Sequence, residues 1–430
     1  MTAVKRYTLP VEKLKPGMVI HSIAVQSGKL VVKKKGRVRH LNIIDQLIAS
    51  GVESVVIEHK VANPKTSAKP ASPPKLPKKA DVASKSEQIK ESEIKEQLET
   101  IDLHDEFESE EVLAFPKLST PTPSSFEDEL DIAEGLVIEC KKLHKKLALN
   151  IEKGLKIDVS ESKKLVSELQ LSLMRNPDAL LCLSMIRNEG QYLSNHAMHT
   201  SILMCHFAQH LGFSEVDCQR LGLLGYFFDI GMLKVPKHIL NKQGRPTEEE
   251  HKLIQAHVWH SLELLEPLKL DNEIKLAIEQ HHERLDGSGY PHQLIAEDIH
   301  KFSRMLAIVD CYDAMTTNRP HQKKSTPASA LKMISNKEFG YDTKLAMQFI
   351  RCMGVYPVGS LVVLSNNHIA VVIKTNRKDA LKPKVRQFYN ISGNEYVDTV
   401  DINLADGIEI SIQKPTLAEI YQIDISRAGL

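Results

Sequence analysis

The sequence is poor in aromatic residues and contains neither a paired-cysteine motif nor a long apolar run. Only 5% of its 430 residues are aromatic, and one of them is tryptophan. The six cysteines are scattered without a C-x-x-C pair, which is typical of proteins in a reducing cytosol. No apolar run approaches the roughly 18 residues of a membrane span, and the start, MTAVKRYTLP, lacks a signal peptide's apolar stretch. We therefore expect a cytoplasmic protein without a membrane span.

The sequence also lacks an excess of charge of either sign. Lysine and arginine number 56, and aspartate and glutamate number 55. Nucleic-acid-binding and membrane-adsorbed proteins usually carry a strong positive field, which this balance excludes for the chain as a whole. We expect no nucleic-acid partner, and any anionic ligand has to be held by a local site.

Composition and periodicity predict a small domain and then a linker in the first part of the chain. Residues 1–60 contain short β-rich runs and one helical pattern, which predicts a small α/β domain. Residues 61–128 are rich in Pro, Lys and Ser and then in Glu and Asp. Such a stretch buries too little apolar surface to offset its chain entropy, so we predict a disordered linker there.

The remaining chain predicts a helical domain followed by a β-rich extension. Residues 129–355 show apolar positions at helical spacing, and a capping-box pattern begins at Thr247. Residues 356–430 contain β-branched runs, two of which are joined by Asn366-Asn367 in the manner of a hairpin. The predicted fold class is mainly α, an all-helical domain with a small N-terminal α/β domain and a short C-terminal β-rich extension.

Carboxylates and imidazoles occupy unusual places in the helical region. Asp229 follows the apolar segment LGLLGYFF, and Asp310 lies within MLAIVDCYDAM. A carboxylate on an apolar helix face is costly unless it is paired, hydrogen-bonded or bound to a metal. His281 and His282 are adjacent at the end of a predicted helix, just before a glycine-rich loop. Because neighbouring helical residues diverge by about 100°, two imidazoles reach one ion only at a helix edge or end.

Two further histidines, His196 and His257, lie on separate predicted helices and complete a set of six donors. Mixed imidazole and carboxylate ligation suits divalent iron, manganese or zinc, and the sequence does not distinguish among them. Taken singly, each residue is equally well explained as an ordinary core or surface residue, since histidine is common in this region. The adjacent histidine pair before the glycine-rich loop is the more specific signal.

The segment HHERLDGSGYP, from His281 to Pro291, resembles the HHExxDGxGYP signature of the HD-GYP family of cyclic di-GMP phosphodiesterases. Two other segments resemble the family, YFFDIGMLKVPKHILNKQGRPTEEE upstream and SRMLAIVDCYDAMTTNRP downstream. The resemblance covers roughly residues 175–360. In addition, LPVEKLKPGMVIHSI resembles a small domain that often precedes HD-GYP domains. The resemblance implies an HD-type helical domain that hydrolyses cyclic di-GMP to pGpG or GMP.

The resemblance also implies roles for individual residues. Asp229 would be the catalytic carboxylate that bridges two metal ions, and Tyr290, Asp313 and Arg319 would bind the dinucleotide. One ion would take the side chains of His257, His281 and His282, and the other those of His196 and Asp310. The implied cofactor is one or two divalent transition-metal ions, of iron, manganese or zinc. The implied metal ligands are therefore His196, Asp229, His257, His281, His282 and Asp310.

The sequence departs from the family pattern at two positions of one motif. The family signature His-Asp-x-Gly-Lys reads FDIGM here, so that Phe228 replaces a histidine ligand and Met232 replaces a lysine. A phenyl ring offers no lone pair to a metal, and a thioether carries no positive charge. We therefore predict that the ion served by His196 and Asp310 has lost a ligand. A further departure, His321-Gln322, follows the arginine segment.

These observations leave three hypotheses open. The first is a phosphodiesterase that cleaves cyclic di-GMP with an impaired or metal-restricted centre. The second is a catalytically inactive regulator that binds cyclic di-GMP or a signalling partner such as a diguanylate cyclase, which Phe228 and Met232 favour. The third is an HD-type hydrolase of another phosphorylated substrate, which the intact GYP segment disfavours. The sequence leaves the survival of hydrolysis, the metal's identity, the N-terminal signal and the oligomeric state open.

Overall fold

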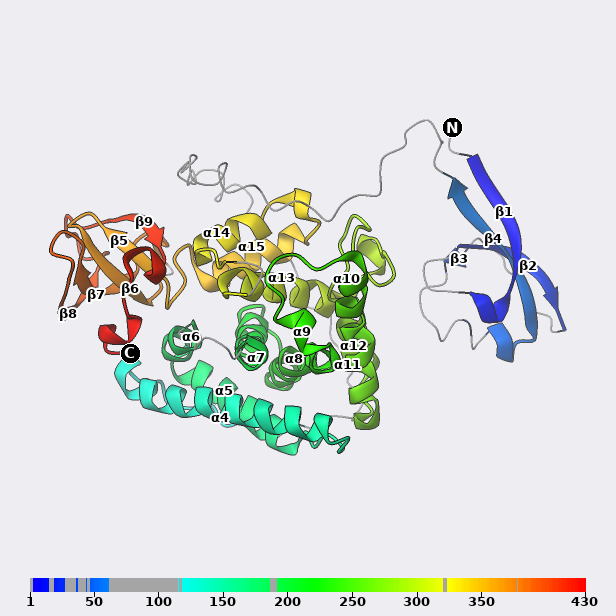
Figure 1. The fold of residues 1–430 in the computed structure, drawn as a ribbon, viewed down its shortest axis with the longest axis horizontal. Helices are drawn as coiled ribbons and strands as arrows, with labels where there is room; N and C mark the ends of the chain where they lie inside the picture. The colour runs from blue at the N-terminus through cyan, green and yellow to red at the C-terminus, as the bar shows by residue number, and fades with distance from the viewer. Residues whose placement is uncertain are drawn as a thin grey trace. The chain divides into compact units, whose positions relative to one another are not determined.

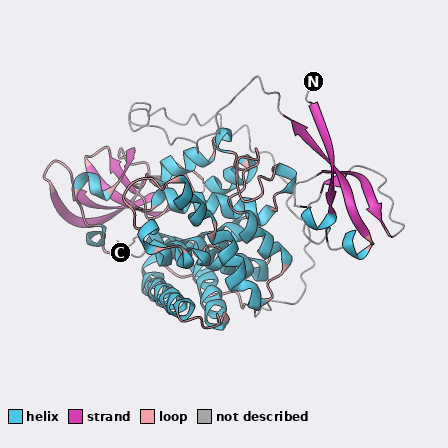
Figure 2. Ribbon diagram, turned by 45° about the vertical axis from the view of Figure 1, so that its right-hand side comes forward, coloured by secondary structure: helices cyan, strands magenta, loops and turns pink. Residues whose placement is uncertain are grey.

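The computed structural model places the described residues in two units, Met1–Glu108 and Ser109–Leu430 (Figures 1 and 2). Most of the predicted linker, residues 61–128, falls outside the described part of the chain. Its disorder therefore stays a prediction. The described residues are 3–14, 19–27, 36–37, 44, 47–61, 115, 118–185, 192–319, 323–376 and 378–430.

The first unit contains an antiparallel sheet with the strand order β1-β4-β2-β3. A small apolar core that includes Val55 and Ile57 is buried against this sheet. Part of the predicted helix of this domain lies outside the described residues. The strands are β1 (Ala3–Pro10), β2 (Val19–Gln26), β3 (Gly36–Arg37) and β4 (Val52–Val61), and a 3-10 turn η1 (Val11–Lys13) follows β1.

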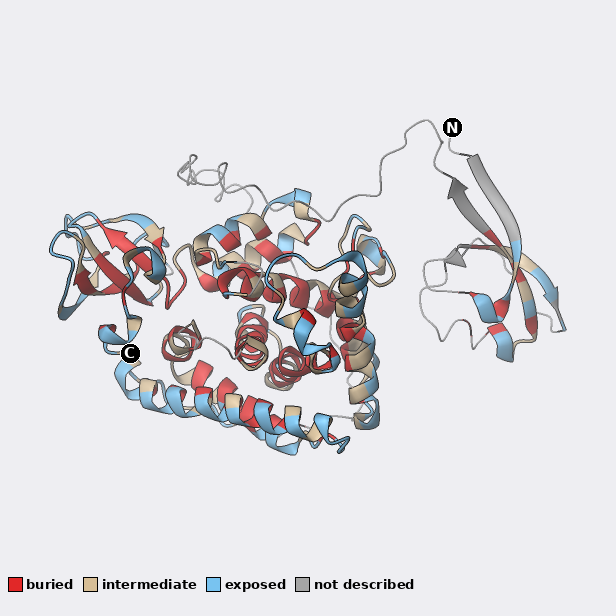
Figure 3. Ribbon diagram, viewed as in Figure 1, coloured by how far each residue is buried: buried red, intermediate tan, exposed pale blue. Residues whose placement is uncertain are grey.

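The second unit begins with helices whose apolar faces converge on one buried core. Buried residues are concentrated on α7 and α8 at its centre (Figure 3). The helices are α4 (Phe126–Glu152), α5 (Ser160–Arg175), α6 (Pro177–Met185), α7 (Tyr192–His210), α8 (Glu215–Phe227), α9 (Lys237–Leu240), α10 (Glu248–Gln255), α11 (His257–Leu265), α12 (Asn272–Gln280), α13 (Lys301–Thr316), α14 (Pro327–Ile334) and α15 (Thr343–Met353). Short 3-10 segments are η2 (Ile230–Lys234), η3 (Glu266–Leu268), η4 (Ala296–Asp298) and η5 (Lys337–Phe339).

Side-chain caps fix where several of these helices begin. The predicted capping box is present, because the Thr247 hydroxyl accepts from the backbone of Glu250 while the Glu250 carboxylate accepts from the backbone of Thr247. Ser125 caps α4 and Asp271 caps α12 by accepting backbone N–H groups in the first turn. These bonds satisfy amides that have no partner within the helix.

The chain closes with an antiparallel sheet of strand order β8-β7-β6-β5-β9. The predicted hairpin at Asn366-Asn367 joins β5 to β6, and Asn367 adopts the left-handed conformation with φ 62° that such turns require. The apolar core of the helices continues into this sheet. Its elements are β5 (Leu361–Leu364), β6 (His368–Lys374), β7 (Lys384–Asn390), β8 (Glu395–Asn403) and β9 (Ile412–Thr416), followed by α16 (Ala418–Tyr421) and η6 (Ile425–Ala428).

The predicted fold class is confirmed, since a helical core stands between N-terminal strands and a C-terminal antiparallel sheet. The boundaries drawn at residues 60, 128 and 355 stay predictions. Within the described ranges, every helix is too short or too polar to traverse a bilayer.

A buried ion pair between Glu129 on α4 and Arg175 on α5 gives a test of this packing. The carboxylate of Glu129 accepts hydrogen bonds from Arg175 Nε and Nη2, both at 2.8 Å. We expect Glu129→Gln to lower the free energy of unfolding by about 3 kcal/mol at pH 7, because Arg175 then keeps a largely buried charge without its partner. Urea unfolding of wild type and variant measures this difference.

The pH dependence of that difference follows from the pKa of Glu129. Burial raises this pKa, but hydrogen bonds from Arg175 and Ser124 outweigh burial and hold it below the ordinary value of 4.5. The ion pair therefore stabilises the fold above pH 4.5, and this contribution is lost as the pH falls through the lower folded pKa. The difference in unfolding free energy between variant and wild type should therefore narrow as the pH falls below 4.5. The control Glu134→Gln, on the exposed face of α4, should stay within about 0.5 kcal/mol of wild type. A gap independent of pH would contradict this role of the carboxylate.

Candidate metal centre

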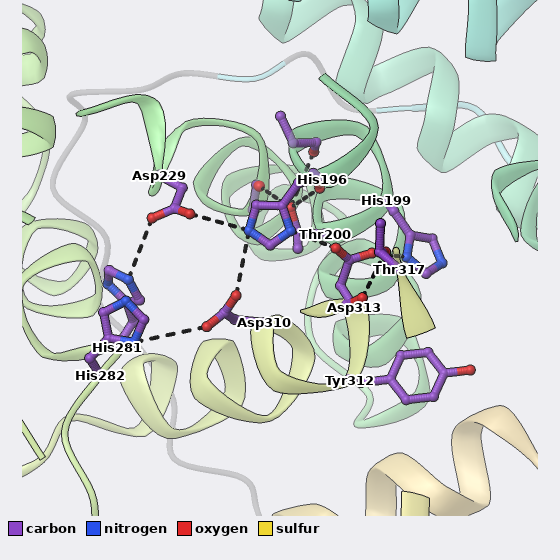
Figure 4. Close-up of polar contacts among 12 residues, drawn as sticks. His196, His199, Thr200, Asp229, His281, His282, Asp310, Tyr312, Asp313 and Thr317 are labelled. Atoms are coloured by element: carbon purple, nitrogen blue, oxygen red, sulfur yellow. Dashed lines mark hydrogen bonds and ion pairs between the residues drawn. The ribbon is translucent and has the colours of Figure 1, made fainter. Parts of the chain in front are cut away.

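The six predicted donors come from five segments of the second unit and gather in one place. Figure 4 shows five of them, His196, Asp229, His281, His282 and Asp310. All except Asp229 and His282 are at least nine-tenths buried. The donors are His196 on α7, Asp229 between α8 and η2, His257 at the start of α11, His281 and His282 after α12, and Asp310 on α13.

A close approach between η2 and α11 positions Asp229. Gly231 lies so near α11 that a Cβ atom there would be 2.1 Å from the carbonyl oxygen of His257. Its backbone N–H donates to the Ser261 hydroxyl at 2.9 Å. Because only glycine fits this contact, the chain can bring Oδ1 of Asp229 to 3.0 Å from Nε2 of His257.

Backbone hydrogen bonds orient two of the imidazoles. His257 Nδ1 donates to the carbonyl of Ile254, and His281 Nδ1 donates to the carbonyl of Ile278, both at 2.6 Å. Each bond fixes the proton on Nδ1, so that Nε2 presents its lone pair to the site. His281 is also the C-cap of α12, so the two adjacent imidazoles stand at the helix end, with ring centroids 4.0 Å apart.

Four of the donors form a group of the size that one ion needs. The ligand atoms of Asp229, His257, His281 and His282 all lie within 4.8 Å of one another. The Nε2 atom of His257 lies 3.3 Å from Nε2 of His281 and 3.2 Å from Nε2 of His282. Donor atoms bonded to one ion at about 2.1 Å are spaced by roughly 3 to 3.5 Å, so these separations fit a shared ion.

The two remaining donors, His196 and Asp310, are connected to this group by contacts that involve carboxylate oxygens. His196 Nε2 lies 3.3 Å from Oδ2 of Asp229 and 3.4 Å from Oδ1 of Asp310. The other oxygen of Asp310 lies 3.9 Å from Nδ1 of His282. Asp229 therefore stands between two sets of donors, with Oδ1 toward His257 and Oδ2 toward His196. Figure 4 shows the contact between Asp229 and His196.

The protonation of His281, His282 and Asp229 fits a divalent cation, whereas for His257 the carboxylate of Asp229 outweighs burial and raises the pKa. Burial lowers the pKa of His281 to about 3, and burial together with the neighbouring His281 holds the pKa of His282 well below its ordinary range, so both are neutral ligands at pH 7. Burial raises the pKa of Asp229, but the imidazoles of His257 and His196 hold it well below the ordinary value. Nε2 of His196 and Oδ1 of Asp229 are buried without a hydrogen bond, as expected of atoms that face an ion.

The ring of Phe228 packs against the rings of two of the histidines. Its side chain is fully buried, and its ring centroid is 5.4 Å from that of His196 and 4.9 Å from that of His281. A histidine in this place would offer a nitrogen beside both rings, whereas the phenyl ring offers only its edge and face. Met232, at the second predicted departure, lies half-buried in η2.

Asp313, which the sequence predicts to bind the dinucleotide, instead forms hydrogen bonds with two histidines. It is fully buried, and its carboxylate accepts hydrogen bonds from Nδ1 of His196 at 2.5 Å and from Nδ1 of His199. These contacts place it behind His196, where a carboxylate orients a ligating imidazole. Sequence reasoning missed His199 in this role, although its spacing of three from His196 matches that of Asp313 from Asp310.

Aromatic rings and a guanidinium flank the donors. The ring of Tyr290 stacks on His282, with centroids 4.5 Å apart, and Tyr192 stacks on His196 at 5.5 Å. The guanidinium of Arg319 lies 4.7 Å from the centroid of the Tyr192 ring, and its buried Nε has no hydrogen-bond partner. The departure at His321-Gln322 lies outside the described residues.

Glu283 holds the glycine-rich loop in place. Its carboxylate accepts the backbone N–H groups of His292 at 2.6 Å and Leu294 at 3.0 Å. Gly289 packs so closely that a Cβ atom would lie 2.4 Å from the Cα atom of Glu283. The glutamate of the signature is thus a loop-fixing residue, and it supports the position of Tyr290 over His282.

Three family models match successive parts of the chain. A model of the HD domain matches residues 181–345, which include all six predicted ligands. A model described as a domain of unknown function, DUF3391, matches residues 6–162. A model described as a KOW domain associated with HD domain matches residues 361–422.

Curated relatives carry the names of cyclic dinucleotide phosphodiesterases. Cyclic di-GMP phosphodiesterase PA4108 of Pseudomonas aeruginosa is 30% identical over 279 residues, which are 65% of this chain and 67% of that protein. 3'3'-cGAMP-specific phosphodiesterase 1 of Vibrio cholerae is 35% identical over 144 residues, 34% of this chain and 33% of the relative. Cyclic di-GMP phosphodiesterase PdeB of Borreliella burgdorferi is 25% identical over 204 residues, 47% of this chain and 53% of the relative. With its HD-domain match and its GYP segment, the chain belongs to the HD-GYP family.

Proposed function

We propose that this chain is a metal-dependent phosphodiesterase that hydrolyses cyclic di-GMP to pGpG or GMP. The observation that carries the proposal is the group of Asp229, His257, His281 and His282, whose ligand atoms all lie within 4.8 Å of one another. Relatives named as phosphodiesterases of cyclic di-GMP and of 3'3'-cGAMP support the choice of a cyclic dinucleotide. The metal is proposed to be iron, manganese or zinc.

The proposed ligands divide between two positions that share Asp229. His257, His281 and His282 would hold one ion, and His196 with Asp310 would hold the other. Bound divalent ions would lower the pKa of a ligated water and neutralise charge on the phosphodiester. Because Phe228 fills the place of a donor, we propose that the second position binds its ion more weakly than the first.

Side chains around the donors would bind the dinucleotide. Arg319 has no ion pair among the described residues, so its guanidinium is available for a phosphate oxygen. The ring of Tyr290 is fixed over His282, where it offers an aromatic face to a guanine base. Asp313 would act by holding the Nδ1 proton of His196, which directs the Nε2 lone pair of that imidazole toward the ion.

Hydrolysis by purified protein tests the proposal. We expect cyclic di-GMP, incubated with the protein and Mn²⁺ or Fe²⁺, to yield pGpG or GMP that chromatography detects above a metal-only control. Chelation of the metal should remove the activity, because the donors alone do not activate water. A parallel reaction with 3'3'-cGAMP compares the two cyclic dinucleotides. Turnover of other nucleotides without turnover of either cyclic dinucleotide would contradict the proposed substrate.

A second candidate function is that of a non-catalytic regulator, which the buried ring of Phe228 between His196 and His281 favours. Such a protein would bind cyclic di-GMP, or a partner such as a diguanylate cyclase, without cleaving the dinucleotide. Calorimetry with cyclic di-GMP separates the two functions, since binding without product formation identifies the regulator. A pull-down with a diguanylate cyclase as the probe tests the protein partner.

A further inference from the structure

A small cavity lies on the side of His196 and Phe228 that is turned toward α4. The space open to the centre of a water molecule is about 10 Å³, which is enough for about one water. Its walls are polar as well as apolar, so a water inside has polar partners. The cavity is lined by His144, Leu193, His196, Ala197, Tyr226, Phe228, Asp229, Ile230 and Leu233.

One of the lining side chains, His144, comes from outside the HD-domain match. It lies on α4 and is 5% exposed, although a histidine in an apolar interior loses its hydration. Among the described residues, its ring nitrogens form no hydrogen bond or ion pair. The imidazole is neutral at pH 7, because burial lowers its pKa to about 4. A neutral imidazole keeps one nitrogen lone pair that can accept a hydrogen bond or bind a metal.

Packing of α4 against α8 holds this imidazole at the cavity. The Tyr226 hydroxyl donates to the carbonyl of Cys140, one helical turn before His144, at 2.9 Å. The rings of Tyr226 and His144 meet edge to face, with centroids 6.1 Å apart. The position of His144 relative to the donors is thus set by the same helix, α8, that ends immediately before Phe228 and Asp229.

The cavity lies where the centre lacks a donor. Phe228, which contacts His196, lines the cavity, and so does Asp229. The only described four-donor group within 4.8 Å excludes His144, so a direct bond from its ring would require movement. A single water in the cavity removes that requirement, because His144 and Asp229 both line the cavity and the water can donate a hydrogen bond to each.

We propose that His144 is an outer ligand of the second metal position, where it holds, through one water molecule, the cation that His196, Asp229 and Asp310 coordinate. This assignment rests on the proposed metal centre and adds a residue of the N-terminal helices to it. His144 partly compensates for the histidine ligand that Phe228 replaces, since a water hydrogen-bonded to His144 takes the place of a direct imidazole donor. Outer partners of this kind typically change metal affinity by 10- to 100-fold.

Metal binding without nucleotide tests this assignment. Full-length protein is stripped of metal and titrated with Mn²⁺ in competition with a fluorescent chelator. For His144→Leu we expect the tighter binding event to be unchanged and the weaker one to lose about 10- to 100-fold in affinity. His144→Gln, which keeps a polar group in the cavity, should lose less. His251→Ala, on the exposed face of α10, is the control and should match wild type.

A double-mutant cycle with Phe228→His separates ligation from packing. If histidine at position 228 supplies the missing donor directly, His144→Leu should have little further effect on the second event in that background. An equal loss in both backgrounds would mean that His144 acts by packing alone, and no loss in either background would also overturn the proposal. A wild type with a single binding event would overturn it too, while the one-ion phosphodiesterase would stand. If wild type shows both Mn²⁺ binding events but no hydrolysis of cyclic di-GMP, the result would count against the proposed function and not against the proposed role of His144.

Discussion

The variant Asp229→Asn is expected to lose both metal binding and hydrolysis. Asp229 is the residue whose two carboxylate oxygens face different donor sets, with Oδ1 3.0 Å from His257 and Oδ2 3.3 Å from His196. An asparagine amide has one oxygen, no charge and an NH₂ group that repels a cation, so both positions weaken together. Loss of metal should lower the rate of cyclic di-GMP hydrolysis by roughly 10³-fold, equivalent to about 4 kcal/mol.

Elemental analysis after dialysis and a chromatographic rate assay measure the two losses. The matched control is Asp131→Asn on the exposed face of α4, which should retain the metal content and rate of wild type. Circular dichroism establishes that both variants are folded. Full metal content in the Asp229→Asn protein would show that this carboxylate is not a ligand.

The double variant Phe228→His with Met232→Lys is expected to gain metal. The ring of Phe228 already stands about 5 Å from those of two proposed ligands, at 5.4 Å from His196 and 4.9 Å from His281. An imidazole has a shape close to that of the phenyl ring and adds two nitrogens, so the metal content should rise toward two ions per chain. Recruitment of the second ion should raise the rate of hydrolysis by at least about tenfold, or 1.4 kcal/mol.

Stability gives a second measure of the same change. Without metal, a buried imidazole that has no partner should make the double variant less stable than wild type. Metal at about 100 times its dissociation constant should then return about 2.7 kcal/mol, which thermal unfolding with and without Mn²⁺ detects. The single variants separate the two effects. Phe228→His should raise the metal content, and Met232→Lys should change the rate of hydrolysis without changing the metal content. An unchanged metal content in both proteins that carry Phe228→His would contradict the account of the missing donor.

The features that the sequence could predict are those that depend on residues close together in the chain. His281 and His282 end α12 and precede a glycine-rich loop, and this arrangement lies within one continuous segment of the chain. The capping box at Thr247 and the hairpin at Asn366-Asn367 are equally local, and both are present as predicted. In each case the residues that define the feature are close in sequence, so their spacing alone determines the geometry.

Contacts between distant segments could not be predicted in the same way. Asp313 and His196 are 117 positions apart, and their hydrogen bond depends on how α13 crosses α7. His144 is one of several histidines in helical segments, and only the packing of α4 places it in a cavity with His196 and Asp229. The sequence indicated that Phe228 removes a donor, but the two rings that it contacts became evident only in three dimensions.

A crystal structure of the wild-type protein grown with Mn²⁺, with anomalous diffraction data, tests the central claim most directly. We predict an anomalous peak about 2.0 to 2.3 Å from ligand atoms of Asp229, His257, His281 and His282. A weaker peak should lie on the His196 side of Asp229, next to the ring of Phe228. Absence of the first peak at saturating Mn²⁺, or a peak bound by other residues, would contradict the proposed centre.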